Sequence, residues 1–161
     1  MITKAVTNNQ IARAKDLYKF GELNGSITKG KSNLYGAVGE IIVFDMFQKN
    51  GSNIEFTSTY DYDMIVDGIK IDVKTKRTTV TPKPHYLCSI SNFNTKQECD
   101  VYIFVRVLDN FGTAFILGGM TKKEFFKKAH FRKKGDHDIN DFEFKDDCYN
   151  LEIQKLVEFV I

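Results

Sequence analysis

The sequence lacks closely spaced cysteine pairs and long apolar runs. Its 161 residues contain three cysteines, Cys88, Cys99 and Cys148. An odd number at such wide spacing indicates neither a disulfide framework nor a zinc knuckle, and it favours a reducing cytoplasm. No apolar stretch approaches the roughly 20 residues of a membrane span, and residues 1–10 lack the apolar centre of a secretion signal. We therefore expect a soluble cytoplasmic protein that does not enter a membrane.

Several short motifs of known chemistry are also absent. The histidines are not arranged as HExxH, and the glycine-bearing segment 25–31 lacks the spacing of a P-loop. Residues 136–147 begin like a calcium-binding loop, but Asp141 stands where that loop needs glycine and Asp147 where it needs glutamate. These departures leave the calcium loop as a minor alternative.

The composition suits a single domain with an uneven charge distribution. Hydrophobic residues make up 42% of the chain, enough for one sizeable core. The formal net charge is only +2, but the charged residues are mostly basic in 122–134 and mostly acidic in 136–152. A local basic block suits a polyanionic partner, and it is equally compatible with a solvated helix face.

Helical periodicity predicts two helices in the first third of the chain. The first is capped by Asn8 or Asn9 and runs to about Gly21, and the second is capped by Ser32 and runs to about Asn50. Apolar residues surround most of the second helix, which indicates packing on more than one side.

Glu40 interrupts the apolar surface of that second helix. An ionised carboxylate in such a place needs a cation, a hydrogen-bond network or solvent at an edge. Gly36 and Gly39 flank it, and their lack of side chains would let a strand or a ligand approach. The alternative is a glutamate at the rim that pairs with a lysine.

Residues 60–77 are predicted to form a β-hairpin with charge on one face. Asp67-Gly68 is a favoured two-residue turn because both positions tolerate positive φ. In the resulting register Asp63 lies directly opposite Asp72, which destabilises a sheet unless a cation is bound. Lys74 projects to the same face as Asp72. The register therefore predicts a cluster of two acids and a lysine.

The rest of the chain reads mainly as strands. No helix is expected between residues 78 and 100, and Thr121 to Glu124 fits a capping box that opens a short helix with one basic side. The remaining strands are expected at residues 54–58, 86–91, 101–108 and 113–117, with a strand or a strand and short helix in 151–161.

Four of these residues together resemble the signature of the PD-(D/E)xK nuclease superfamily, which includes restriction endonucleases, Holliday-junction resolvases and phage nucleases. Asp63 matches the first motif acid, Asp72 and Lys74 match the (D/E)xK element, and Glu40 stands where resolvase-like members carry a helix glutamate. Tyr62 replaces the motif proline.

The resemblance covers residues 32–108 and implies a fold. We expect an α/β protein with a restriction-endonuclease-like central mixed β-sheet flanked by helices, formed by residues 1–161 as one domain. A family core of one helix, three strands and a further strand would occupy the matched region.

The resemblance also implies an activity. We expect a metal-dependent DNA endonuclease that hydrolyses phosphodiester bonds, and a resolvase-like member would act on branched DNA. Carboxylate oxygens suit Mg²⁺, with Mn²⁺ as a substitute. Glu40, Asp63, Asp72 and the backbone carbonyl of Val73 would hold the metal, and Lys74 would assist the attacking water. A homodimer in the cytoplasm of a prokaryotic cell or a phage-infected host fits this picture.

Basic residues outside the cluster are candidate phosphate contacts. Two rivals remain: a non-catalytic nucleic-acid-binding protein with a nuclease-like fold, and a structural protein that uses the same charges in salt bridges. Convergence of the four signature side chains is what the catalytic hypothesis requires. The candidate DNA contacts are Lys29, Lys31, Lys76, Arg77, Lys83, Lys122, Lys123, Lys127, Lys128, Arg132, Lys133 and Lys134.

Overall fold

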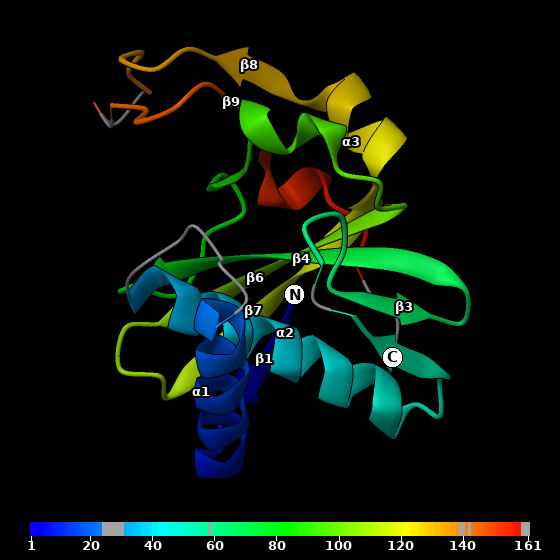
Figure 1. The fold of residues 1–161 in the computed structure, drawn as a ribbon. Coiled ribbons are helices and arrows are strands. Elements are labelled where there is room, and N and C mark those ends of the chain that lie inside the picture. The colour runs from blue at the N-terminus through cyan, green and yellow to red at the C-terminus, as the bar shows by residue number, and fades with distance from the viewer. Residues whose placement is uncertain (24–30, 58, 139–140, 142, 159–161) are drawn as a thin grey trace.

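A six-stranded mixed sheet forms the centre of the computed structural model (Figure 1). The structure describes residues 1–23, 31–57, 59–138, 141 and 143–158, with the backbone alone for 18–23 and 31–33. The strand order is β1-β7-β6-β4-β3-β2, in which β4 and β6 are parallel and the other neighbours antiparallel. The strands are β1 (Ile2–Ala5), β2 (Ile54–Phe56), β3 (Met64–Val66), β4 (Ile69–Thr78), β6 (Val101–Leu108) and β7 (Thr113–Thr121).

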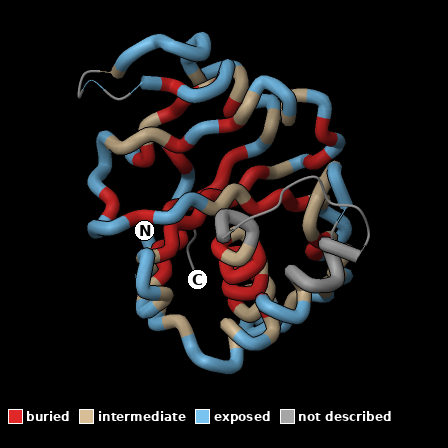
Figure 2. The backbone as a smooth tube through the Cα atoms, turned by 60° about the vertical axis from the view of Figure 1, so that its left-hand side comes forward, coloured by how far each residue is buried: buried red, intermediate tan, exposed pale blue. Residues whose placement is uncertain are grey.

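Helices α1 (Asn8–Leu23) and α2 (Lys31–Lys49) cover one face of this sheet (Figure 1). Val38, Ile42 and Val43 of α2 are buried against Ile71 and other apolar residues of β4, β6 and β7. Buried residues run through the middle of the molecule and exposed ones along its outside (Figure 2). Because α2 is apolar around most of its circumference, it packs between α1 and the sheet, as predicted.

A second layer lies on the other face of the sheet (Figure 1). Tyr102, Phe104 and Phe125 belong to a second cluster of buried side chains that joins this layer to the central strands. The layer consists of a sheet in the order β5 (Leu87–Ser91), β9 (Cys148–Glu152) and β8 (His130–Arg132), helix α3 (Lys122–Lys128), and the 3₁₀ turns η1 (Asn92–Lys96) and η2 (Ile153–Lys155).

The predicted α/β class is confirmed, and so are both helices and the turn of the hairpin. Asp67 and Gly68 have φ values of 49° and 86°, as a two-residue turn of this kind requires. The predicted helix caps are wrong. The side chain of Thr7 accepts a hydrogen bond from the Gln10 N–H, so Thr7 caps α1. Helix α2 already begins at Lys31, one residue before the expected cap.

Two short strands were not predicted: β1, which pairs with β7, and β8, which pairs with β9. Between residues 78 and 100 the chain forms β5 and η1 and no α-helix, as expected. In the portions of the chain that the structure describes, no helix combines the length and the hydrophobicity needed to cross a bilayer.

Candidate active site

The site lies where β3 separates from β4. Three pairs of the predicted hairpin register are confirmed, down to Met64 opposite Ile71. The fourth, Asp63 opposite Asp72, is wrong, because the ladder ends before it. The backbone N–H of Asp63 instead donates to the Ile71 carbonyl at 2.9 Å, and its Oδ2 accepts from the Val73 N–H at 2.7 Å. Beyond the end of the β3–β4 ladder, the Asp63 carboxylate thus accepts the hydrogen bond from β4 that a backbone carbonyl of β3 would otherwise accept.

Asp72 and Lys74 project together from β4, as their alternation predicts. Lys74 Nζ lies 2.7 Å from Asp72 Oδ2. This close contact is an ion pair between a buried carboxylate and a largely buried ammonium group. Asp72 is only 3% exposed, so its carboxylate depends on these neighbours.

Gln97 bridges the two charged groups. Its Nε2 donates to Asp72 Oδ1 at 3.0 Å and to the Tyr60 carbonyl at 2.6 Å, and its Oε1 accepts from Lys74 Nζ at 2.9 Å. Lys122 Nζ donates to the backbone carbonyl of Gln97. This buried amide therefore fixes the positions of Asp72 and Lys74 relative to each other.

Helix α2 brings Glu40 to the same place through a close approach to β4. A Cβ atom on Gly39 would lie 1.9 Å from Thr75 Oγ1, so only glycine permits this packing. The prediction that two glycines let a strand approach is confirmed at Gly39 and wrong at Gly36, where a Cβ atom would meet nothing within 4 Å. Glu40, the next residue, is partly exposed and lies near enough to Asp72 and Asp63 for their charges to interact.

The three carboxylates destabilise one another's ionised forms. Burial, and then the charge of Asp72, raise the pKa of Glu40 to about 7. Burial, and then the charges of Glu40 and Asp72, raise the pKa of Asp63 well above its usual value. Burial also raises the pKa of Asp72, against the opposing effects of Lys74 and Gln97. Such mutual shifts are typical of functional sites and of carboxylates that share a cation.

The donor set suits a hard divalent cation. Glu40, Asp63 and Asp72 offer carboxylate oxygens, the ligands that Mg²⁺ and Mn²⁺ prefer, and a cation would relieve their repulsion. Asp72 Oδ2 is buried beside the Lys74 ammonium, so a bound cation would share this oxygen with Lys74. Among the described residues, no three His, Cys, Asp or Glu side chains already stand in a metal-binding arrangement.

Gln97 and Lys122 are the residues that sequence reasoning did not place in this site. Gln97 lies in a polar stretch between η1 and β6, with no motif or periodicity to single it out. Lys122 was predicted only as part of a basic block. No signal in the sequence marks either residue, since both enter the site through contacts across 23 residues of chain or more.

The other predicted DNA contacts are dispersed. Lys76 lines a cavity beside Lys74. Arg77 lies 3.6 Å from Asp109, and both Lys127 and Lys128 lie within 3.8 Å of Glu124. Lys29 and the Lys31 side chain lie outside the described residues. The remaining five are exposed at the surface of the described part of the chain: Lys83, Lys123, Arg132, Lys133 and Lys134.

No protein-family model matches the chain, and no curated protein is significantly similar to it in sequence.

Proposed function

We propose that this protein is a metal-dependent deoxyribonuclease that hydrolyses phosphodiester bonds within DNA. One observation carries the proposal: Glu40, Asp63 and Asp72 interact electrostatically within one site, and Lys74 is held beside Asp72. One lysine faces three carboxylates, and the raised pKa values of Glu40 and Asp63 show that their ionised forms lack sufficient cationic partners, which a divalent cation would supply.

The order of elements supports the same proposal. Helix α2 is followed by the antiparallel strands β2, β3 and β4, and then by β6, which is parallel to β4. This is the succession of a helix, three strands and a further strand that the resemblance to PD-(D/E)xK nucleases implies. A restriction-endonuclease-like fold is therefore part of the proposal.

Glu40, Asp63, Asp72 and the Val73 carbonyl would hold Mg²⁺ or Mn²⁺. When bound, the metal lowers the pKa of a coordinated water and stabilises charge that develops on the phosphodiester. Retained waters and substrate phosphates usually complete the coordination of Mg²⁺. The shared repulsion of the carboxylates fits this role, because a divalent cation offsets it directly.

Lys74 would act on the water and the phosphate. Asp72 Oδ2 and Gln97 Oε1 hold its ammonium group in place, and 19% of its side chain remains accessible. From this position it can donate a hydrogen bond to the attacking water or to a phosphate oxygen, and its charge offsets the charge that builds up in the transition state. Gln97 is a positioning residue for both Lys74 and Asp72.

Cleavage assays test this function. We expect the wild-type protein to cut one or more of supercoiled plasmid, single-stranded DNA and a four-way junction in the presence of Mg²⁺ or Mn²⁺. Asp72→Asn and Lys74→Met should each reduce the rate by about 100-fold or more, as loss of a preorganised electrostatic group does elsewhere. Lys15→Met, which alters an exposed lysine of α1, should leave the rate unchanged.

Cleavage that persists in both site variants would refute the assigned site. Binding of DNA without cleavage of any substrate would instead favour the non-catalytic nucleic-acid-binding protein. Circular dichroism of each variant separates loss of activity from loss of folding.

A further inference from the structure

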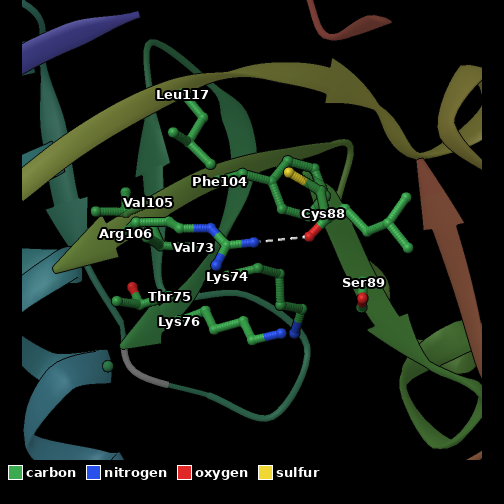
Figure 3. A pocket seen from close by; sticks show the side chains of 12 residues that line it. Val73, Lys74, Thr75, Lys76, Cys88, Ser89, Phe104, Val105, Arg106 and Leu117 are labelled. Atoms are coloured by element: carbon green, nitrogen blue, oxygen red, sulfur yellow. Dashed lines mark hydrogen bonds between the residues drawn. The ribbon is translucent and has the colours of Figure 1, made fainter. Parts of the chain in front are cut away.

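A cavity of about 250 Å³ lies beside the carboxylate cluster and is lined by cations. Lys74 and Lys76 of β4 and Arg106 of β6 all extend into it (Figure 3). The parallel pairing of β4 with β6 places Lys76 directly beside Arg106. Like charges at neighbouring positions of a sheet destabilise it, and Asp138 offsets part of the positive charge on the Lys76 side only.

Arg106 is a buried cation with few partners. It is 7% exposed, its Nη2 donates to the Leu87 carbonyl at 2.9 Å, and its guanidinium lies 5.8 Å from the centre of the Tyr86 ring. A guanidinium has five N–H donors. No carboxylate forms an ion pair with it among the residues that the structure describes. Burial of a cation without a counter-charge is costly, and an anion in the cavity would remove that cost.

Lys76 reaches the surface beside this buried arginine. Partial desolvation, and then the charge of Arg106, lower its pKa, whereas the nearby Asp138 acts in the opposite direction. Lys76 therefore lies between a positive charge, that of Arg106, and a negative charge, that of Asp138. The acidic neighbour provides a second way to test what this lysine does.

We propose that Lys76 and Arg106 bind a phosphate of the DNA strand adjacent to the phosphate that is cleaved. The proposal deepens the nuclease function and rests on it. Lys74 and Lys76 lie on the same side of β4, about 7 Å apart along the strand, a separation comparable with that of successive phosphates in an extended nucleic-acid strand. Arginine recognises phosphate oxygens through paired N–H donors, and lysine contributes a point charge.

This second phosphate subsite would set the register of the substrate. A strand anchored at Lys76 and Arg106 presents its neighbouring phosphate to Lys74 and Asp72. The subsite is not sequence-specific, because phosphate contacts position a strand without reading its bases. If Arg106 served only to tie β5 to β6 through the Leu87 carbonyl, removal of the Lys76 charge would not affect DNA binding.

The test measures binding of a fluorescent single-stranded oligonucleotide by anisotropy, in EDTA and at several salt concentrations. Lys76→Met should weaken binding about tenfold and reduce the slope of log K against log salt by about 0.7, the value for one lost contact to single-stranded DNA. Arg106→Lys keeps the charge but loses the paired donors, so its affinity should lie between those of the wild type and Lys76→Met. Asp138→Asn should tighten binding about twofold, and Lys15→Met is the control for loss of one surface charge.

A single neutral methylphosphonate linkage sharpens the assignment. In a trinucleotide, whose two linkages have to occupy the Lys74 and Lys76 positions together, one of the two methylphosphonate placements should weaken binding to the wild type about as much as Lys76→Met does, with little further loss in that variant.

Two results would overturn the subsite: equal affinity and salt slope for Lys76→Met and Lys15→Met, or no binding of DNA by the wild type. The subsite and the nuclease function fail separately. If Lys76→Met loses binding but the wild type cleaves nothing, the subsite stands and the catalytic function falls. If the wild type cleaves DNA and Lys76→Met binds it normally, the catalytic function stands and the phosphate subsite falls.

Discussion

Asp72 shows how individual residues in this site depend on one another. Its Oδ1 accepts from Gln97 and its Oδ2 lies beside Lys74, while Glu40 and Asp63 bring further negative charge nearby. Each carboxylate is harder to ionise than it would be in the unfolded chain. The folded protein therefore holds an electrostatic repulsion that a bound cation would relieve.

Glu40→Gln tests that repulsion through the pH dependence of stability. The folded protein binds the Glu40 proton more tightly than the unfolded chain does, so the free energy of unfolding should fall as pH rises from about 4.5 to 7. Without metal, Glu40→Gln should be more stable than the wild type at pH 8, by a few kcal/mol or several degrees in Tm, with little difference near pH 4.5.

Thermal unfolding from pH 4.5 to pH 8 measures this effect, with Glu55→Gln on an exposed position of β2 as control. If the wild type and Glu40→Gln lost stability in parallel over that range, the carboxylate of Glu40 would not carry the repulsion. The stabilised variant should nevertheless be inactive, because it lacks a metal ligand.

The sequence indicated which residues gather in this cluster better than it indicated their contacts. Alternation along β4 correctly placed Asp72 and Lys74 on one face, and the odd position of Glu40 in an apolar helix correctly indicated a special environment. The direct opposition of Asp63 and Asp72 was wrong, because the end of a two-strand ladder depends on the path of the preceding loop. Gln97 could not be predicted, since its partners are distant in the chain.

At the scale of elements, the approach of α2 to β4 positions the site. Gly39 lies against Thr75, so the helix comes closer to the strand than a side chain would allow. This contact places Glu40 at the point where β3 separates from β4. The geometry of the carboxylates thus depends on a residue without a side chain.

Two glycines of α2 form a matched pair for testing this contact. Gly39→Ala should destabilise the protein by about 1–3 kcal/mol, because the new Cβ overlaps Thr75 Oγ1. Gly36→Ala, one turn earlier, meets nothing within 4 Å and should stabilise it by about 0.5–1 kcal/mol through helix propensity. Urea unfolding measures both values.

Thr75→Ala should recover part of the loss in Gly39→Ala by removing the overlapping hydroxyl. Equal stability of the Gly36→Ala and Gly39→Ala variants would mean that α2 and β4 are not in close contact at this point.

Long elements with a regular pattern were predictable, and short edge strands were not. The apolar periodicity of α2 and the Asp67-Gly68 turn are local signals, and the structure confirms both elements. Strands β1 and β8 have only 4 and 3 residues, and they pair with segments more than 15 residues away. The pairing of such short strands depends on tertiary contacts, and these contacts cannot be predicted from composition or periodicity.

At the scale of the whole molecule, the central sheet separates two layers. Helices α1 and α2 pack on one face, and the second sheet with α3 packs on the other (Figure 1). Strand β4 has side chains on both faces of the sheet. Val73 is buried toward the helices. Asp72, Lys74 and Lys76 project to the opposite face, where the two lysines line the cavity. One strand thereby supplies core packing, the proposed metal ligands Asp72 and Val73, and the lysines Lys74 and Lys76 that are proposed to contact neighbouring phosphates.

The central claim for this protein is that Glu40, Asp63 and Asp72 together hold a divalent cation. Calorimetric titration of Mn²⁺ at pH 8, with a short oligonucleotide present, measures this directly. We predict binding to the wild type and at least a tenfold loss of affinity in both Asp63→Asn and Asp72→Asn, with no change in Glu55→Gln. Absence of Mn²⁺ binding in the wild type, or equal affinity in all four proteins, would contradict the account.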